Sequence, residues 1–306
     1  MSPGRTVVTS VVLALLVNGM FAASAAAQEL HRSLRPPPTG GLPVVPFMEG
    51  WYSNADGSVT VSFGYDNRNK NDVYVPRGAD NRIDPPSLDG MQPEVFYQGR
   101  QHGVFAVTIP ASMREDTIWW HIKSGKSDAL SVPGELGSTA YELDRNPRPQ
   151  GSLQPLIWFQ QNNPGTGPEG VVSPDVKTVA VGVPLTLEVG TEDPSVRDPS
   201  NPLFAKPLDT RVIWYRHQGP GEVQFTEDPS TPFMTTPFVS LRGQTSAPAS
   251  RIAIPGGKGP ARVVATFPEP GDYMIRARLD NWNASDSDGY DQCCWSHAFQ
   301  RVRVTE

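Results

Sequence analysis

Apolar and polar side chains alternate in short runs along the chain. The clearest early run covers residues 59–65, where an apolar residue stands at every odd position. Similar alternation covers 105–109 and 118–122. A period of two residues is typical of a β-strand that buries one face. The pattern therefore predicts strands at these three places, with Trp119 and His121 on the opposite face of the third strand from its apolar residues.

The second half of the chain repeats this alternation more often. The runs stand at 185–189, 212–214, 223–225, 263–267, 273–279 and 302–304. Turn sequences such as Gly219-Pro220-Gly221 and Pro270-Gly271 separate them. Six or seven short strands with turns between them are what an antiparallel sandwich requires, so the fold class we predict is all-β.

The N-terminus predicts an export signal. Arg5 supplies a positive start, an apolar run follows over 11–21, and Ala25-Ala26-Ala27 has the small residues of a cleavage site. The apolar run is shorter than the ~20 residues that a membrane span needs. We therefore expect residues 1–27 to be a cleaved signal peptide, with no transmembrane segment in the mature chain and a periplasmic or secreted location in a bacterium.

Composition shifts predict the domain organisation of the mature chain. Residues 28–46 are rich in proline and glycine and read as a tether. Two β domains are expected at 47–145 and 171–306, because the alternating runs fall there. The segment 146–170 between them is rich in proline and is predicted to be a linker. Within it, residues 156–159 are too apolar for solvent and should pack against one domain or between the two.

Several motifs of the second domain together resemble a known class of extracellular module. They are Val181 to Leu187, Trp214, Gly219 to Phe225, Ala265 to Phe267 and Pro270 to Tyr273. Over residues 171–306 the chain resembles PKD-like and bacterial Ig-like modules, which implies a β-sandwich used as a spacer, an adhesive unit or an accessory binding domain. The chain departs from the antibody pattern, since no cysteine pair flanks Trp214, and it carries long insertions at 226–260 and 281–297.

Composition and charge exclude several function classes. Hydrophobic residues make up 38% and charged residues 19% of the chain, which is typical of a folded protein. The net charge is −6 and becomes −7 once Arg5 is removed with the signal, which argues against nucleic acid as a partner. The sequence contains no G-x-S-x-G, H-E-x-x-H, P-loop or dinucleotide-binding motif. We therefore expect no enzyme activity and no cofactor.

The loop predicted at 280–297 holds the most unusual residues. Cys293 and Cys294 are adjacent, and three readings stay open: a strained vicinal disulfide, which we favour, a pair of free thiols, or a bridge to another chain. A disulfide between neighbours closes almost no loop, so it adds little stability through chain entropy. The candidate metal ligands nearby are Asp286, Asp288, Asp291 and His297. Carboxylates favour Ca²⁺, whereas thiolates and imidazole favour Cu(I) or Zn²⁺, so we favour an ordinary loop over a metal site.

A basic sheet face is the second candidate site. If the apolar residues of 273–279 and 302–304 point inward, the arginines between them point outward. The strand at 211–215 should lie beside them. The predicted face holds Arg211, Arg276, Arg278, Arg301 and Arg303. Like charges at this spacing repel, and a partner such as an anionic polysaccharide, phosphate groups or an acidic patch on the first domain would relieve this repulsion. We favour the other interpretation, a solvated face whose arginine stems cover apolar surface.

Tryptophan is the third candidate. Trp51, Trp119, Trp158 and Trp282 do not all fit into two small cores. Outward tryptophans stack against sugar rings or form contacts between domains. We favour contacts between domains, because Trp158 lies in the predicted linker.

These observations predict two antiparallel β-sandwich (Ig-like) domains after a cleaved signal peptide. The function we expect is that of a secreted, non-catalytic protein of the bacterial envelope with a binding or structural role. Its expected partner is an anionic glycan or another envelope protein. The alternatives are an accessory carbohydrate-recognition protein and a metal- or redox-linked protein that uses the 286–297 loop.

Overall fold

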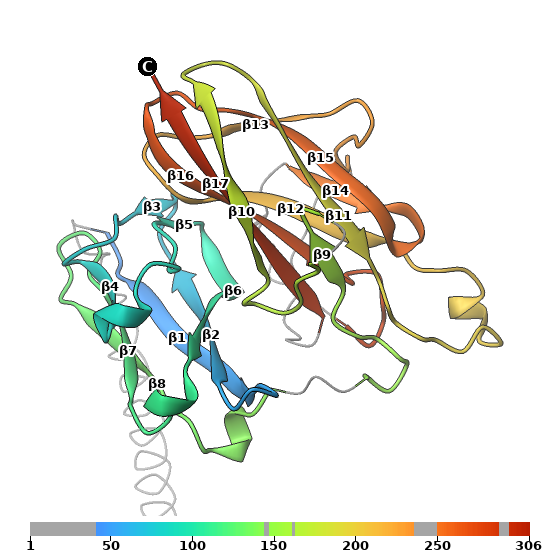
Figure 1. The fold of residues 1–306 in the computed structure, drawn as a ribbon, viewed down its shortest axis with the longest axis horizontal. Coiled ribbons are helices and arrows are strands. Elements are labelled where there is room, and N and C mark those ends of the chain that lie inside the picture. The colour runs from blue at the N-terminus through green and yellow to red at the C-terminus, as the bar shows by residue number, and fades with distance from the viewer. Residues whose placement is uncertain (1–40, 144–146, 161–162, 236–249, 288–293) are drawn as a thin grey trace, which may run out of the picture. The chain divides into compact units, whose positions relative to one another are not determined.

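Strands form nearly all of the regular structure. The computed structural model describes residues 41–143, 147–160, 163–235, 250–287 and 294–306, and Gly40–Glu306 cluster into one compact unit. In the described residues the only helices are 3₁₀ turns of three residues each. None of them is long or apolar enough to cross a membrane. The chain is all-β, as the alternating pattern predicts (Figure 1).

The N-terminal half is a sandwich of two three-stranded antiparallel sheets. The first sheet has the order β1 (Val44–Ser53), β2 (Val59–Asn67), β6 (Gly99–Ile109), and the second has the order β4 (Asn81–Asp84), β7 (Ile118–Ile122), β8 (Leu130–Gly134). A short ladder of β3 (Val73–Tyr74) and β5 (Val95–Phe96) accompanies them. The strands predicted at 59–65, 105–109 and 118–122 are therefore confirmed.

The core of this sandwich is built on one aromatic residue from β7. Trp120 is completely buried, and its ring centroid lies 4.9 Å from that of Phe105 and 5.9 Å from that of Phe63. Its Nε1 donates a 3.1 Å hydrogen bond to Oδ1 of Asn81 in β4. Because buried indole N–H groups need an acceptor, this bond lets a large aromatic residue fill the core without leaving a polar atom unpaired.

The C-terminal half contains a larger sandwich. One sheet has the order β10 (Val171–Ala180), β17 (Trp295–Thr305), β16 (Gly271–Asp280), β12 (Thr210–Gln218), β14 (Arg251–Ile254). The other has the order β13 (Gln224–Glu227), β15 (Lys258–Thr266), β11 (Leu185–Glu192), β9 (Leu156–Trp158). All neighbours are antiparallel except β10 and β17, which run parallel and lie side by side in Figure 1.

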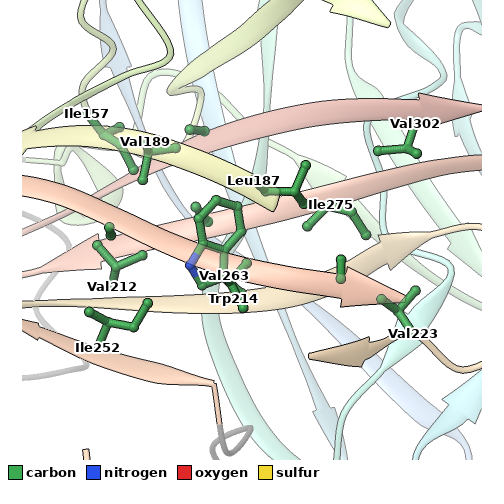
Figure 2. Close-up of a cluster of buried hydrophobic side chains, with 14 of the residues drawn as sticks. Ile157, Leu187, Val189, Val212, Trp214, Val223, Ile252, Val263, Ile275 and Val302 are labelled. Atoms are coloured by element: carbon green, nitrogen blue, oxygen red, sulfur yellow. The ribbon is translucent and has the colours of Figure 1, made fainter. Parts of the chain in front are cut away.

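Trp214 of β12 fills the core between these sheets. Figure 2 shows its indole among apolar side chains from both sheets, including Val263 of β15 and Ile275 of β16. All three side chains are completely buried. Ile157 of β9 is also completely buried in this core. The apolar segment 156–159 therefore packs against a sandwich, as expected, and contributes a strand to it.

The strand order of the C-terminal sandwich is Ig-like. Strands β11 and β15 pair in one sheet, while β12, β16 and β17 are neighbours in the other, as the B–E and C–F–G strands are in Ig domains. The hydroxyl of Tyr273, near the start of β16, donates a 2.9 Å hydrogen bond to the carbonyl of Glu269, which is the tyrosine corner of that fold. Ile275 stands two residues later, where antibody domains carry a cysteine.

Two details of the C-terminal sandwich differ from the expected pattern. Strand β13 joins the sheet of β15 before β14 joins the sheet of β12, so the chain changes sheets twice within the predicted insertion at 226–260. The predicted loop at 280–297 is shorter than expected, because β17 already begins at Trp295. His297 therefore lies in a strand, where it is completely buried.

Candidate functional site

The arginine face forms, but most of it is covered. Arg211 of β12 and Arg276 and Arg278 of β16 lie on the sheet face opposite the Trp214 core, and they are 6%, 3% and 8% exposed. The prediction that all five arginines face solvent is therefore wrong for these three. Arg301 and Arg303, near the end of β17, are exposed as expected. The physical reason is that residues of β5 and β6 from the N-terminal sandwich pack on this face.

Arg276 is the most buried of these three arginines. Its Nη1 donates a hydrogen bond to the carbonyl of Val104 in β6, and its guanidinium lies 4.5 Å from the ring centroid of Tyr215. Burial lowers the pKa of Arg276 below its ordinary value, because the charged form has lost its water. Among the described residues its Nε has no hydrogen-bond partner. The first sandwich therefore contacts Arg276 through a carbonyl and not through the acidic patch that is one of the predicted partners, and the aromatic ring comes from the neighbouring strand β12.

Arg278 and Arg211 share the carboxylate of Asp280. Arg211 contacts it with two nitrogens, at 3.2 and 2.9 Å, and Arg278 Nε lies 3.6 Å from the same group. The guanidinium of Arg278 also lies 4.7 Å from the ring centroid of Trp295. Two-point contacts between arginine and carboxylate are among the stronger ion pairs, so Asp280 offsets part of the positive charge. It does so within the same sheet, since Asp280 is the last residue of β16.

Hydrogen bonds from the end of β12 complete this contact. The hydroxyl of Tyr97 accepts from the Arg216 backbone N–H at 2.9 Å and donates to the Arg216 carbonyl at 3.3 Å. The N–H of Glu94 donates to the carbonyl of His217 at 2.8 Å, and a Glu94 carboxylate oxygen accepts from the N–H of Gly219 at 2.8 Å. We call the set Glu94, Tyr97, Gly103, Val104, His217, Arg276, Arg278 and Trp295 the sandwich joint.

Two histidines of this face are held neutral. Burial, followed by the nearby charge of Arg276, lowers the pKa of His217 to about 3. The same two causes lower the pKa of His297 well below its ordinary value. His217 Nε2 donates to the Met91 carbonyl at 2.8 Å, and His297 Nδ1 donates to the Pro168 carbonyl at 3.3 Å. Both rings therefore act as neutral hydrogen-bond donors.

The predicted metal ligands are not brought together in the described part of the chain. Asp286 accepts hydrogen bonds from the backbone N–H groups of Gln150 and Ser152 and from the Ser152 hydroxyl, so it stabilises the turn at 150–152. His297 lies buried in β17. No group of three ligand-type residues that would suit a metal occurs among the described residues. Asp288 and Asp291 lie outside the described residues.

Cys294 is buried, with 1% of its surface exposed. It is not a free thiol, and its backbone carbonyl accepts a 3.1 Å hydrogen bond from the N–H of Asn281. Cys293 lies outside the described residues, so the pairing of these two cysteines stays a prediction.

The tryptophans occupy four different environments. Trp51 belongs to the N-terminal core, and Trp158 packs against Gly190 in the C-terminal sandwich. Trp282 is 36% exposed, and the Arg211 guanidinium lies 5.6 Å from its ring centroid. Trp119 is 38% exposed on the outer face of β7. The expectation of contacts between domains is therefore wrong for Trp119, and also for Trp51 and Trp158, each of which packs within one sandwich.

The sandwich joint also contains residues that sequence reasoning missed. Trp295 packs directly on Gly103, where a Cβ atom would lie 2.2 Å from its Nε1. Tyr97 and Glu94 follow a polar loop and carry no motif. His217 did carry a signal, because it continues the alternation of Arg211 and Tyr215 along β12 and therefore shares their face.

Comparisons with known proteins give distant likenesses only. No family model and no curated protein matches the chain. Among solved structures, the D0-D1 domain of intimin is 12% identical, with 85% of this chain and 98% of that chain covered and a TM-score of 0.24. The adhesin InvE of Yersinia pseudotuberculosis is 8% identical, with 86% and 58% covered and a TM-score of 0.24. Tandem Ig domains of titin are 9% identical, with 86% and 97% covered and a TM-score of 0.22.

Likenesses at these TM-scores carry no argument about individual residues. The strand order, the parallel β10–β17 pair and the corner formed by Tyr273 carry the assignment instead. By these features, the C-terminal half of the chain is an Ig-like β-sandwich module.

Proposed function

We propose that this chain is a non-catalytic protein of the bacterial envelope in which two sandwiches act together as one binding or structural module. The sandwich joint is the observation that carries the proposal. Arg276 and Tyr97 each bond to backbone groups of the opposite sandwich, and Arg276 is buried. Such bonds require a defined geometry, so the joint supports a module that presents its outer surfaces in a fixed relation.

Export is the second part of the proposal. It is supported by the charged, apolar and small-residue regions of residues 1–27. The full chain, expressed in a bacterium with a C-terminal tag, should appear in the periplasm or the medium with Gln28 as its first residue. N-terminal sequencing of each fraction measures this. A cytoplasmic chain that keeps residues 1–27 would contradict the proposal.

Binding is tested with the mature chain. Purified protein is mixed with isolated peptidoglycan sacculi and, separately, with outer-membrane vesicles, and the pelleted fraction is measured against concentration. We expect saturable pelleting with one of the two. A chain unfolded by heat serves as the control for nonspecific pelleting. Failure to pellet with either would contradict a binding role in the envelope.

Carbohydrate recognition is the second candidate function. Trp119 favours it, because a partly exposed indole on an outer sheet face can stack against a sugar ring. The metal- or redox-linked alternative gains no such support, since Asp286 and His297 are engaged with different partners.

A further inference from the structure

The outer face of the β4–β7–β8 sheet carries an aromatic pair, Trp119 and His121. Strand β7 buries Ile118, Trp120 and Ile122 completely or almost completely in the N-terminal core. Trp119 and His121 point the other way, and Trp119 is 38% exposed. Their ring centroids are 6.4 Å apart, with 20° between the ring planes. The indole of Trp119 is therefore presented to solvent beside the imidazole of His121, and an aromatic ring in this position can stack against a ligand.

Strand register surrounds this pair with polar groups. Asp84 of β4 and Pro133 of β8 lie opposite Trp119, while Arg82 and Ser131 lie opposite His121. We call Arg82, Asp84, Trp119, His121, Ser131 and Pro133 the β7 platform. Two positions on each of three strands span about 10 Å across the strands and about 7 Å along them. The platform therefore offers one flat aromatic area with hydrogen-bonding groups beside it.

The polar groups of the platform are already oriented. Arg82 Nη1 donates to the Ala79 carbonyl at 3.1 Å, and the Ser131 hydroxyl lies 2.7 Å from Nδ1 of His121. Both bonds leave further donor or acceptor sites on the same side chains. Arg82 and Asp84 are exposed, so a ligand that reaches the aromatic rings also reaches a guanidinium and a carboxylate.

The charges of the β7 platform favour a neutral ligand. The platform contains one arginine and one aspartate, whose charges cancel. Partial burial, followed by the charge of Arg82, lowers the pKa of His121, so the ring adds no charge at neutral pH. Nucleic acids also stack on aromatic side chains, but they require a positive surface, and this chain carries a net charge of −6. A neutral ligand with an apolar face and hydroxyl groups fits better.

We propose that the β7 platform binds a neutral saccharide, with a sugar ring stacked on Trp119 and its hydroxyls bonded to Asp84 and Arg82. The C–H face of the sugar covers the indole, and Ser131 and His121 contact the neighbouring ring. The proposal rests on the envelope-binding function above and names its ligand class.

The experiment uses the mature chain on a printed glycan array. The array carries neutral hexose and N-acetylhexosamine oligosaccharides, uronic-acid oligosaccharides and an oligothymidine strand. We expect binding to at least one neutral oligosaccharide and none to oligothymidine. Titration calorimetry with that oligosaccharide should then show at least tenfold weaker binding for Trp119→Ala and for Asp84→Asn, whereas Trp119→Phe keeps part of the affinity.

Trp282→Ala is the matched control. It removes a tryptophan of similar exposure, 36%, from the other sandwich and should leave the affinity unchanged. Thermal unfolding of every variant shows whether it is folded. Equal affinity of Trp119→Ala and the wild type, or no neutral oligosaccharide bound on the array, overturns the proposal. If Trp119→Ala pellets with the envelope fractions as efficiently as the wild type does, this result would support the envelope-binding function and contradict only the role of the β7 platform in it.

Discussion

Arg276 shows how a single charge can be accommodated without an opposite charge. Among the described residues it contacts a carbonyl and a tyrosine ring rather than a carboxylate. Removing a cation from water costs free energy, and one neutral hydrogen bond returns only part of it. Its long stem also fills space between the sheets. The volume of the Arg276 side chain therefore stabilises the fold, whereas its buried charge destabilises it.

Substitutions at Arg276 should separate these two effects. Arg276→Ala should lower the free energy of unfolding by about 3 kcal/mol, because it leaves a cavity. Arg276→Met should cost clearly less, because it keeps the volume and removes the buried charge. Urea unfolding of the two variants measures the difference. Equal losses would show that the hydrogen bond to Val104 dominates.

His217 makes stability depend on pH. Its pKa is about 3 in the folded chain and near 6.5 when unfolded, so the unfolded state binds more protons between these values. The contribution of neutral His217 to the free energy of unfolding is therefore fully present above pH 6.5, and it is lost as the pH falls toward 3. The contribution of His217 is at most about 1.4 kcal/mol per pH unit. His217→Gln, whose amide can still donate to Met91, should show a shallower acid loss in urea unfolding from pH 7 to 4. An identical slope would remove His217 as the cause.

The cysteine pair gives a prediction for mass spectrometry. If Cys293 and Cys294 are bonded to each other, the denatured mature chain should weigh ~2 Da less before reduction than after it. An unchanged mass would show free thiols. A doubled mass that reduction halves would show a bridge between chains.

At the scale of elements, strand β6 determines how closely the two sandwiches approach. Gly103 has a φ of +53° and lies where the register between β2 and β6 shifts, which is the position of glycine in a β-bulge. Its N–H donates to a carboxylate oxygen of Glu49 at 2.5 Å. The missing side chain leaves the space that Trp295 fills. One glycine thus provides both the bend of β6 and the contact with β17.

Gly103→Ala should therefore cost more than the backbone conformation alone. Gly182 provides the matched control, since its φ of +73° is similar and a Cβ atom there would meet nothing within 4 Å. We expect Gly182→Ala to lower the free energy of unfolding by about 1 kcal/mol. Gly103→Ala should lower it by about 1–3 kcal/mol more, because the methyl group collides with Trp295. Similar losses for the two variants in thermal or urea unfolding would mean that Trp295 can move to accommodate the methyl group.

Local patterns account for the strands but not for their partners. Alternation predicts strand positions such as 59–65 and 273–279 because a period of two is a property of neighbouring residues. The same alternation places Arg276 and Arg278 on one face. What covers that face depends on Gly103 and Tyr97, which are more than 170 residues away in the chain and belong to the N-terminal sandwich. Burial of the arginines and exposure of Trp119 are consequences of long-range packing, and no short motif carries them.

At the scale of the whole molecule, the joint makes each sandwich depend on the other. Unfolding the N-terminal sandwich alone would expose the arginine face and leave the partners of Tyr97 and Glu94 in water. Chains whose parts share a large buried contact unfold together when that contact contributes much of their stability. We therefore expect the two sandwiches of the described unit to unfold together, which would keep their outer faces, the β7 platform among them, in a fixed relation.

Calorimetry tests this dependence. We expect one unfolding transition for the mature chain, with equal calorimetric and van't Hoff enthalpies. Gly103→Ala weakens the sandwich joint and should therefore split or broaden this unfolding transition. Two separate transitions in the wild-type chain would show that the sandwiches are independent.

The parallel pairing of β10 with β17 has a mechanical consequence. Val171, at the start of β10, lies beside Ala298, and Ala180, at its end, lies beside Thr305. If the chain before β10 and the end of β17 are pulled in opposite directions, the force runs along both strands. The interstrand hydrogen bonds are then sheared together instead of being opened one at a time. An envelope protein anchored at one end and loaded at the other would resist extension at this pair of strands.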